Sequence, residues 1–136
     1  MAESFRELVA WQKAMALAEI AYRIARSLPR EERYHIGSQI IRAAISVPAN
    51  IAEGCGRGAK RDYARFLSIA RGSLAELETH LLLAFRLFHT SPKDHRSALE
   101  LITEVGKMLA ALQRHLRRSS SPADAGHKQS GPPVNC

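Results

Sequence analysis

The chain has 136 residues, of which 20 are Lys or Arg and 13 are Asp or Glu, so its formal net charge is +7. A chain of this length forms one domain and can bury a core without disulfides or metals. The hydrophobic fraction of 46% argues against disorder over most of the length, and eight Gly with six Pro are few for an all-β fold.

The start of the chain lacks the basic and apolar pattern of a secretory signal. No apolar run approaches the ~20 residues that a membrane span needs. We therefore expect a cytoplasmic protein that makes no membrane contact.

A first helix is predicted over about residues 5–28, because Ser4 and Glu7 have the spacing of a capping box and Pro29 follows. Two apolar stripes run along it with the helical period. One contains Leu8, Trp11, Met15, Ala18, Tyr22 and Ala25, and the other contains Leu17, Ile20, Ile24 and Leu28. So wide an apolar surface predicts contacts on two sides of the helix.

A second helix is predicted over about residues 34–54, where Pro48 removes one backbone donor and is expected to bend it. Its apolar positions are Ile36, Ile40, Ala44, Val47 and Ile51. Gly54, Gly56 and Gly58 are expected to end this helix. The glycine-rich stretch superficially resembles a phosphate-binding loop, but it follows a helix and not a strand, so we interpret it as a helix end and turn.

Third and fourth helices are predicted over about residues 60–88 and 92–118. Heptad spacing on the third joins Tyr63, Leu67, Ala70, Leu74, Leu77, Leu81, Ala84 and Phe88. On the fourth it joins Ala98, Ile102, Val105, Leu109, Leu112 and Leu116, after an expected N-cap at Ser91. Residues 119–136 are rich in Ser, Pro and Gly and are predicted to form a disordered tail.

Four helices with short connections predict an all-α fold, an antiparallel up-down-up-down four-helix bundle over residues 1–118. The heptad seams and the double stripe on the first helix exceed what one bundle core must bury. We therefore expect a homo-oligomer, with the alternative that the wide apolar surface belongs to a fully enclosed helix.

A stripe of polar residues accompanies the apolar face of the second helix. Its members are Gln39, Arg42, Ser46, Asn50 and Glu53, joined by Ser73 and Glu76 on the third helix. A partly buried Arg42 would need a carboxylate, for which Glu53 and Glu76 are candidates. Two interpretations remain open: a hydrogen-bonded network that fixes helix register or a subunit interface, and a ligand or RNA site.

A basic cluster formed by Arg57, Lys60, Arg61 and Arg65 lies at the start of the third helix, beside Tyr63 and Phe66. Such a row of cations can follow the phosphates of a nucleic acid. The alternative is an ordinary solvated helix start, although positive charge there opposes the helix dipole. Arg114, Arg117 and Arg118 lie near a helix C-terminus, where cations are favoured and need no functional explanation.

Neither a metal centre nor a catalytic site is predicted. Of the six histidines, only His35 has the Glu-x-x-His spacing of a diiron bundle, and Glu76 with His80 is as easily a helical hydrogen-bonded pair. No nucleophile elbow or zinc-protease motif occurs. We expect no catalytic residue, no metal and no cofactor, and hence a protein that is not an enzyme.

Three stretches carry a family resemblance: LVAWQKA at 8–14, QIIRAAISVPANIAEG at 39–54 and FLSIARGSLAELE at 66–78, with Gly56 and Arg57 between the last two. Together they closely resemble the four-helix-bundle proteins encoded in intervening sequences of bacterial 23S ribosomal RNA genes. The resemblance spans about residues 5–116. Its signature positions here are Arg42, Asn50, Glu53, Gly54, Gly56, Arg57, Ser73 and Glu76.

The resemblance implies a small helical protein without established enzymatic activity, with homopentamers known among relatives. The chain is also similar, more distantly, to the accessory proteins of diversity-generating retroelements, basic pentameric bundles associated with a reverse transcriptase and nucleic acid. We therefore expect a pentamer that binds nucleic acid, RNA rather than DNA, through its basic surface. The alternative is an oligomeric scaffold for a protein partner, such as a reverse transcriptase, with no direct nucleic-acid role.

Overall fold

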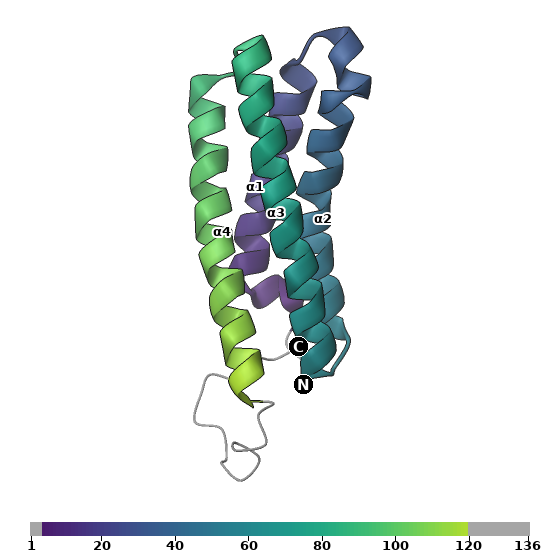
Figure 1. The fold of residues 1–136 in the computed structure, drawn as a ribbon, viewed down its shortest axis with the longest axis vertical. Helices are drawn as coiled ribbons and strands as arrows, with labels where there is room; N and C mark the ends of the chain where they lie inside the picture. Colours follow the sequence, from purple (N-terminus) through teal and green to yellow (C-terminus); the bar gives the residue numbers. More distant parts are fainter. Residues whose placement is uncertain (1–3, 120–136) are drawn as a thin grey trace.

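The computed structural model describes residues 4–119. Of the tail predicted over residues 119–136, Ser119 is the last residue of the fourth helix, and residues 120–136 lie outside the described range. The elements are η1 (Phe5–Glu7), α1 (Val9–Ser27), η2 (Arg30–Tyr34), α2 (Ile36–Gly56), α3 (Lys60–Phe88) and α4 (Pro92–Ser119). Figure 1 shows the four α-helices side by side, each running opposite to the next along the chain. The predicted all-α four-helix bundle is confirmed.

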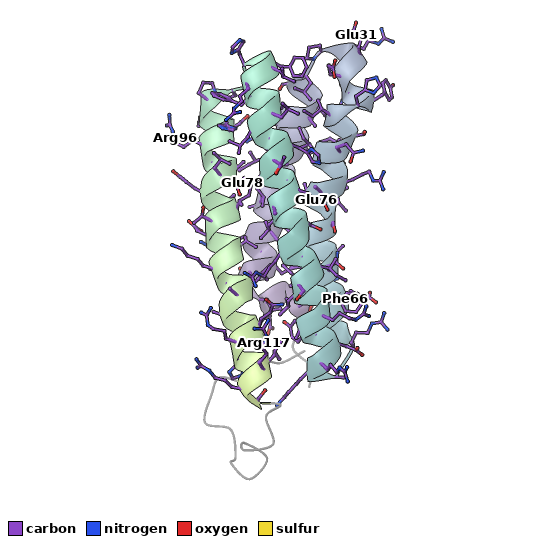
Figure 2. The ribbon with its side chains drawn as sticks, viewed as in Figure 1. Glu31, Phe66, Glu76, Glu78, Arg96 and Arg117 are labelled. Carbon is purple, nitrogen blue, oxygen red and sulfur yellow. The ribbon has the colours of Figure 1, made fainter. Side chains whose placement is uncertain are left out.

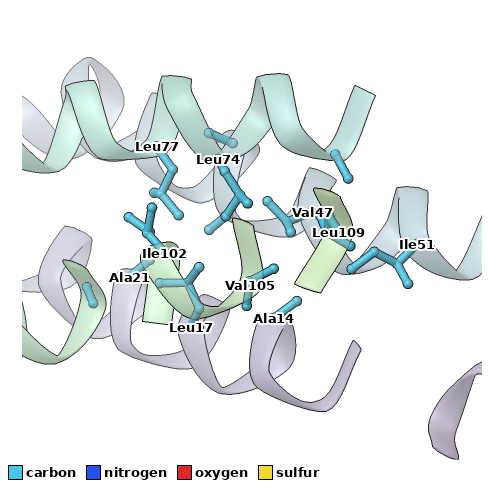
Figure 3. Packing of buried hydrophobic residues seen from close by; sticks show 14 of the residues in the cluster. Ala14, Leu17, Ala21, Val47, Ile51, Leu74, Leu77, Ile102, Val105 and Leu109 are labelled. Carbon is cyan, nitrogen blue, oxygen red and sulfur yellow. The ribbon is translucent and has the colours of Figure 1, made fainter. Parts of the chain in front are cut away.

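The core lies along the axis between the four helices, where α1 and α3 each pack on both α2 and α4. The predicted seam on α3 is buried from Tyr63 to Ala84, and Phe88 at its end is half-buried. Figure 3 shows Ala14, Leu17 and Ala21 of α1 facing Val47, Ile51, Leu74, Leu77, Ile102, Val105 and Leu109 of the other helices. Apolar burial of this kind is the main force that stabilises the bundle.

Contrary to the prediction, the first helix is not continuous from residue 5, because the helical conformation is interrupted at Leu8. Leu8 has an extended backbone, with φ −72° and ψ 124°, between η1 and α1. Ser4 Oγ accepts a hydrogen bond from the backbone N–H of Arg6 at 3.1 Å, and the Gln12 side chain donates to the Arg6 carbonyl at 2.8 Å. Ser4 therefore caps a separate short turn and not α1 itself.

The core side of α1 carries most of one predicted stripe and only part of the other, of which Ala25 is buried and Leu8, Trp11 and Ala18 are partly buried. Leu17, Ile24 and Leu28 are buried, together with alanines at positions 10, 14 and 21 that belong to neither predicted stripe. In the other stripe, the side chains of Met15 and Tyr22 are 39% and 46% exposed. The small alanines let neighbouring helices approach α1 on this side, which leaves the larger side chains outside.

The second helix, α2, begins at Ile36 and ends at Gly56, each two residues later than predicted, and the connection before it forms the turn η2. Pro48 lies inside α2 and is buried. Gly54 does not end the helix but packs against α3. A Cβ atom at Gly54 would lie 2.8 Å from Phe66 Cβ and 3.1 Å from Tyr63 Cδ1. Of the three glycines here, Gly58 alone has a left-handed backbone, with φ +78°.

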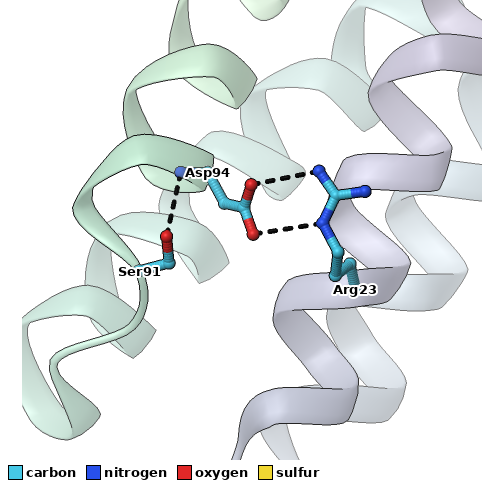
Figure 4. A network of polar contacts seen from close by, with 3 residues as sticks. All are labelled: Arg23, Ser91 and Asp94. Carbon is cyan, nitrogen blue, oxygen red and sulfur yellow. Dashed lines mark hydrogen bonds and ion pairs between the residues drawn. The ribbon is translucent and has the colours of Figure 1, made fainter.

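The opposite end of the bundle is fixed by the hairpin between α3 and α4. Ser91 Oγ accepts from the Asp94 backbone N–H at 3.2 Å, as the predicted N-cap requires. Arg23 of α1 donates two hydrogen bonds to the Asp94 carboxylate, at 3.2 and 3.0 Å (Figure 4). These bonds lower the pKa of Asp94 below its ordinary value and join α1 to the first turn of α4.

We predict that Gly54→Ala lowers the free energy of unfolding by about 1–3 kcal/mol, because the added methyl group overlaps Phe66 and the two helices must separate. Urea unfolding followed by circular dichroism measures the effect.

Gly72→Ala in α3 is the matched control, since a Cβ atom at Gly72 would meet no side chain and no neighbouring helix within 4 Å. The free energy of unfolding of this variant should rise by about 0.5–1 kcal/mol, because alanine lowers the conformational entropy of the unfolded chain. Equal stabilisation by both substitutions would contradict the close approach at Gly54.

Candidate nucleic-acid interface

The four residues predicted to bind nucleic acid lie together at the turn between α2 and α3. Arg57 directly follows α2, Lys60 is the first residue of α3, and Arg61 and Arg65 lie in its first two turns. All four side chains are exposed. The structure therefore brings the whole predicted cluster to one end of the bundle, at the bottom of Figure 1.

Phe66 organises two of these cations. The guanidinium carbon of Arg57 lies 5.0 Å from the centre of the Phe66 ring, and that of Arg65 lies 4.8 Å from it. Both distances are within the range of cation–π attraction, which a ring exerts through its negative face. Phe66 itself is half-buried between α2 and α3. The sequence places Phe66 beside the cluster, but only the fold shows that one ring serves arginines from two elements.

Tyr63, the other aromatic residue beside the cluster, belongs to the core. It is 3% exposed and lies against Gly54. Burial raises the pKa of its phenol to about 12, so the side chain stays neutral at physiological pH. Tyr63 is therefore close to the cluster in sequence but is not part of its surface.

The predicted pairing of Arg42 with a carboxylate is absent among residues 4–119. Arg42 is exposed, because the neighbouring positions 40, 43 and 44 face the core and turn position 42 outward. Glu53 instead forms an ion pair with Arg57, with 2.8 Å between Oε1 and Nη2. Glu76 and Gln39 are also exposed, so the predicted polar stripe is not a single network.

Three members of that stripe do form a network between α2 and α3. The hydroxyl oxygens of Ser46 and Ser73 are 2.7 Å apart, and Ser73 is 8% exposed. Asn50 donates from Nδ2 to the carbonyl oxygen of Ser46 at 2.7 Å and to its hydroxyl oxygen at 2.9 Å. These bonds satisfy polar groups within the helix interface, which supports the structural interpretation for these three residues.

Gln113 in α4 is a second polar anchor, which was not predicted from the sequence. Its side chain is 1% exposed. Its Oε1 atom accepts from Arg71 at 2.8 Å, and Nε2 donates to the Ala64 carbonyl at 3.0 Å and to Ser68 Oγ at 2.6 Å. Gln113 follows the core residue Leu109 by four residues, and this helical spacing could have indicated that Gln113 is buried. Leu112, which was predicted to lie in the core seam, is only half-buried.

The contacts of Gln113 place the last turns of α4 beside the first turns of α3. Figure 2 accordingly shows Arg117 near the same end of the bundle as Phe66. The exposed arginines in the last two turns of α4, namely Arg114, Arg117 and Arg118, thus lie at the end that carries the predicted cluster. We refer to Arg57, Lys60, Arg61, Arg65 and these three arginines as the basic end.

Three further features of the described residues concern metal ligands, grooves and membrane spans. No three His, Cys, Asp or Glu side chains within residues 4–119 are grouped so that they could hold a metal ion. A groove of about 430 Å³ lies between α3 and α4, and its lining contains no His, Cys or Ser. None of the described helices is long and apolar enough to cross a membrane.

A family model described as 23S rRNA-intervening sequence protein matches residues 6–111. The chain belongs to this family. This match confirms the resemblance to the intervening-sequence proteins. The matched range contains Arg57 to Arg65 but ends before Gln113 and before the last three arginines of α4, namely Arg114, Arg117 and Arg118. None of the curated proteins compared with the chain matches it.

A crystal structure of a protein with unknown function, from the S23 ribosomal protein family of Bacteroides thetaiotaomicron, resembles the fold with a TM-score of 0.71. The two chains are 23% identical, and the similarity covers 78% of this chain and 99% of the other. At this identity the likeness supports the four-helix architecture.

We predict that Gln113→Leu lowers the free energy of unfolding by about 1–3 kcal/mol, because the Ala64 carbonyl and the Arg71 guanidinium lose their buried partner. Urea unfolding measures the change. Gln39→Leu, at an exposed position of α2, is the control and should change stability by no more than about 0.5 kcal/mol. Equal stability of the two variants would show that the Gln113 network is dispensable.

Proposed function

We propose that this member of the 23S rRNA-intervening sequence protein family is a cytoplasmic, non-enzymatic homo-oligomer that binds RNA through its basic end. The observation that carries the proposal is the gathering of exposed cations from two helices, two of them on one aromatic ring. The proposed site needs no metal or cofactor, because phosphate binding by arginine and lysine is electrostatic.

The position of the cluster supports a functional role. Lys60 and Arg61 lie in the first turn of α3, where the helix dipole favours anions, and Asp62 is the acidic residue of that turn. Cations at this place therefore oppose helix stability slightly. A bound phosphate would reverse this unfavourable contribution, since it is attracted both by the side chains and by the positive end of the helix.

Assembly into a homo-oligomer, with a pentamer favoured, is supported by the apolar surface left outside the core. Met15 and Tyr22 of α1 and Ile45 of α2 are 39%, 46% and 55% exposed. A second copy of the chain would cover such side chains and would repeat the basic end around the assembly. Repetition raises the local potential and with it the affinity for a polyanion.

RNA is preferred over DNA as the ligand because the description of the family refers to ribosomal RNA. The alternative is a scaffold that docks a protein partner, such as a reverse transcriptase, through the same exposed apolar side chains. Purification of the protein with its bound partners from its own cytoplasm separates the two: RNA that survives moderate salt supports the proposal, and a stoichiometric protein supports the alternative.

We predict that replacing Arg57, Lys60, Arg61 and Arg65 together with Glu abolishes RNA binding while the bundle stays folded, because acidic residues suit the start of α3. For the unmodified protein, the logarithm of affinity should fall by about 0.7–0.9 per log unit of salt for each phosphate neutralised. Fluorescence anisotropy across a salt series measures both effects.

The control replaces Arg30, Arg86, Lys93 and Arg96 with Glu, which changes the charge equally but at exposed positions away from the basic end. Figure 2 shows Arg96 at the end opposite to Phe66. This variant should keep most of its affinity. An equal loss of RNA affinity in both variants would indicate that only net charge matters. RNA binding that is retained when Arg57, Lys60, Arg61 and Arg65 are replaced would remove this cluster from the proposal.

We also predict that the unmodified protein scatters light as a multiple of its 15.1 kDa chain, and that Met15→Glu with Tyr22→Glu dissociates it, since charges at an apolar interface are costly. Ile69→Glu, on an exposed residue of α3, is the control for a different face. A monomer of the unmodified chain would contradict the assembly.

A further inference from the structure

Aromatic rings at the basic end are engaged by the protein itself. Tyr63 is buried. Phe66 has the guanidinium groups of Arg57 and Arg65 within 5.0 Å of its ring centre. Phe5, in the turn η1 that lies at this end (Figure 1), has the guanidinium carbon of Arg6 5.9 Å from its ring centre. Its ring centre lies 5.2 Å from that of Trp11, with the two rings in an edge-to-face arrangement. Phe5, Trp11 and Phe66 are each only partly exposed, so no fully exposed Phe, Tyr or Trp ring lies beside the described cations of the basic end.

This arrangement distinguishes between two kinds of RNA. Proteins that bind single strands stack the unpaired bases on exposed aromatic side chains, each of which contributes strongly to affinity. A double helix keeps its bases stacked inside and offers phosphates and 2′-hydroxyl groups, which cations and polar groups contact without aromatic stacking. The basic end provides exposed guanidinium and ammonium groups, whereas the described Phe, Tyr and Trp rings beside them are buried or only partly exposed.

We infer that the basic end takes the phosphate backbone of double-helical RNA, and that Phe66 is a positioning residue which holds Arg57 and Arg65 as a pair of phosphate ligands. This inference rests on the proposed RNA-binding function and specifies its ligand. In this inference the Phe66 ring positions the two arginines and does not stack on the bases of the RNA.

The structure explains how Phe66 holds the pair. Its Cβ atom lies where a side chain at Gly54 would stand, so the ring is fixed between α2 and α3. Arg57 comes from the end of α2 and Arg65 from the second turn of α3, yet both lie on this one ring. Their guanidinium carbons are therefore no more than about 10 Å apart, which suits neighbouring phosphates of one strand.

Preorganisation is the physical advantage of this arrangement. A free arginine side chain has many rotamers and loses that freedom when it binds, which weakens the complex. The ring already restricts both arginines, and the ion pair of Arg57 with Glu53 restricts one of them further. Each guanidinium has five N–H donors, so donors remain for a phosphate when one faces Glu53.

The test uses the full chain and a matched pair of probes: an RNA duplex and a single strand of the same sequence with no self-complementarity. The unmodified protein should bind the duplex more tightly. Phe66→Leu should weaken duplex binding by about threefold to tenfold with an unchanged salt slope, because the cations remain but are no longer held. Phe66→Tyr keeps the ring and should bind as the unmodified protein does.

Phe85→Leu is the control, since Phe85 lies on the same helix but stacks on His95, 4.2 Å away, at the other end. If Phe66→Leu fails to fold, the double variant Arg57→Lys and Arg65→Lys replaces it. Lysine keeps the charge but lacks the planar fork of arginine, so the same loss is expected.

The outcomes separate this inference from the function on which it rests. Failure of the unmodified protein to bind either probe would overturn the proposed function. Single-strand binding that equals or exceeds duplex binding would overturn the inference alone. Unchanged affinity in Phe66→Leu, or in the double lysine variant, would remove the positioning role of Phe66.

Discussion

The close contact of α3 with α2 at Gly54 is the constraint on which the rest of the basic end depends. A glycine at this position lets the backbone of α2 meet the first turns of α3, where any side chain would collide with Phe66 and Tyr63. The approach buries Tyr63 and leaves Phe66 half-exposed at the edge of the interface. One packing contact therefore supplies both a core residue and the ring on which two arginines lie.

Two polar anchors set the register of the helices around this contact. Ser46, Asn50 and Ser73 join α2 to α3, and Gln113 joins α4 to the start of α3. Apolar contacts are not directional, whereas a buried hydrogen bond is lost when helices slide by one residue. The antiparallel hairpin of α3 and α4 brings the arginines at the end of α4 to the α2–α3 turn, and the Gln113 hydrogen bonds fix the register of these two helices there.

The two ends of the bundle differ in how their charges are used. At the α3–α4 hairpin, Arg23 is bound to Asp94 by two hydrogen bonds, so its charge serves the fold. At the basic end, the ion pair between Glu53 and Arg57 is half-exposed, and Lys60, Arg61 and Arg65 beside it face solvent. The opposite end also exposes cations, among them Arg86 and Arg96, so the feature that distinguishes the basic end is the grouping of two arginines around one aromatic ring.

The sequence by itself determined the four helices, the seam on α3 and the membership of the 23S rRNA-intervening sequence protein family, because helical period and short motifs are local properties. Only the tertiary structure decided which apolar face of α1 is buried, since period marks the faces but not the neighbours that meet them. The partners of Gln113 and the ring shared by Arg57 and Arg65 likewise depend on contacts between separate helices, which no local pattern encodes.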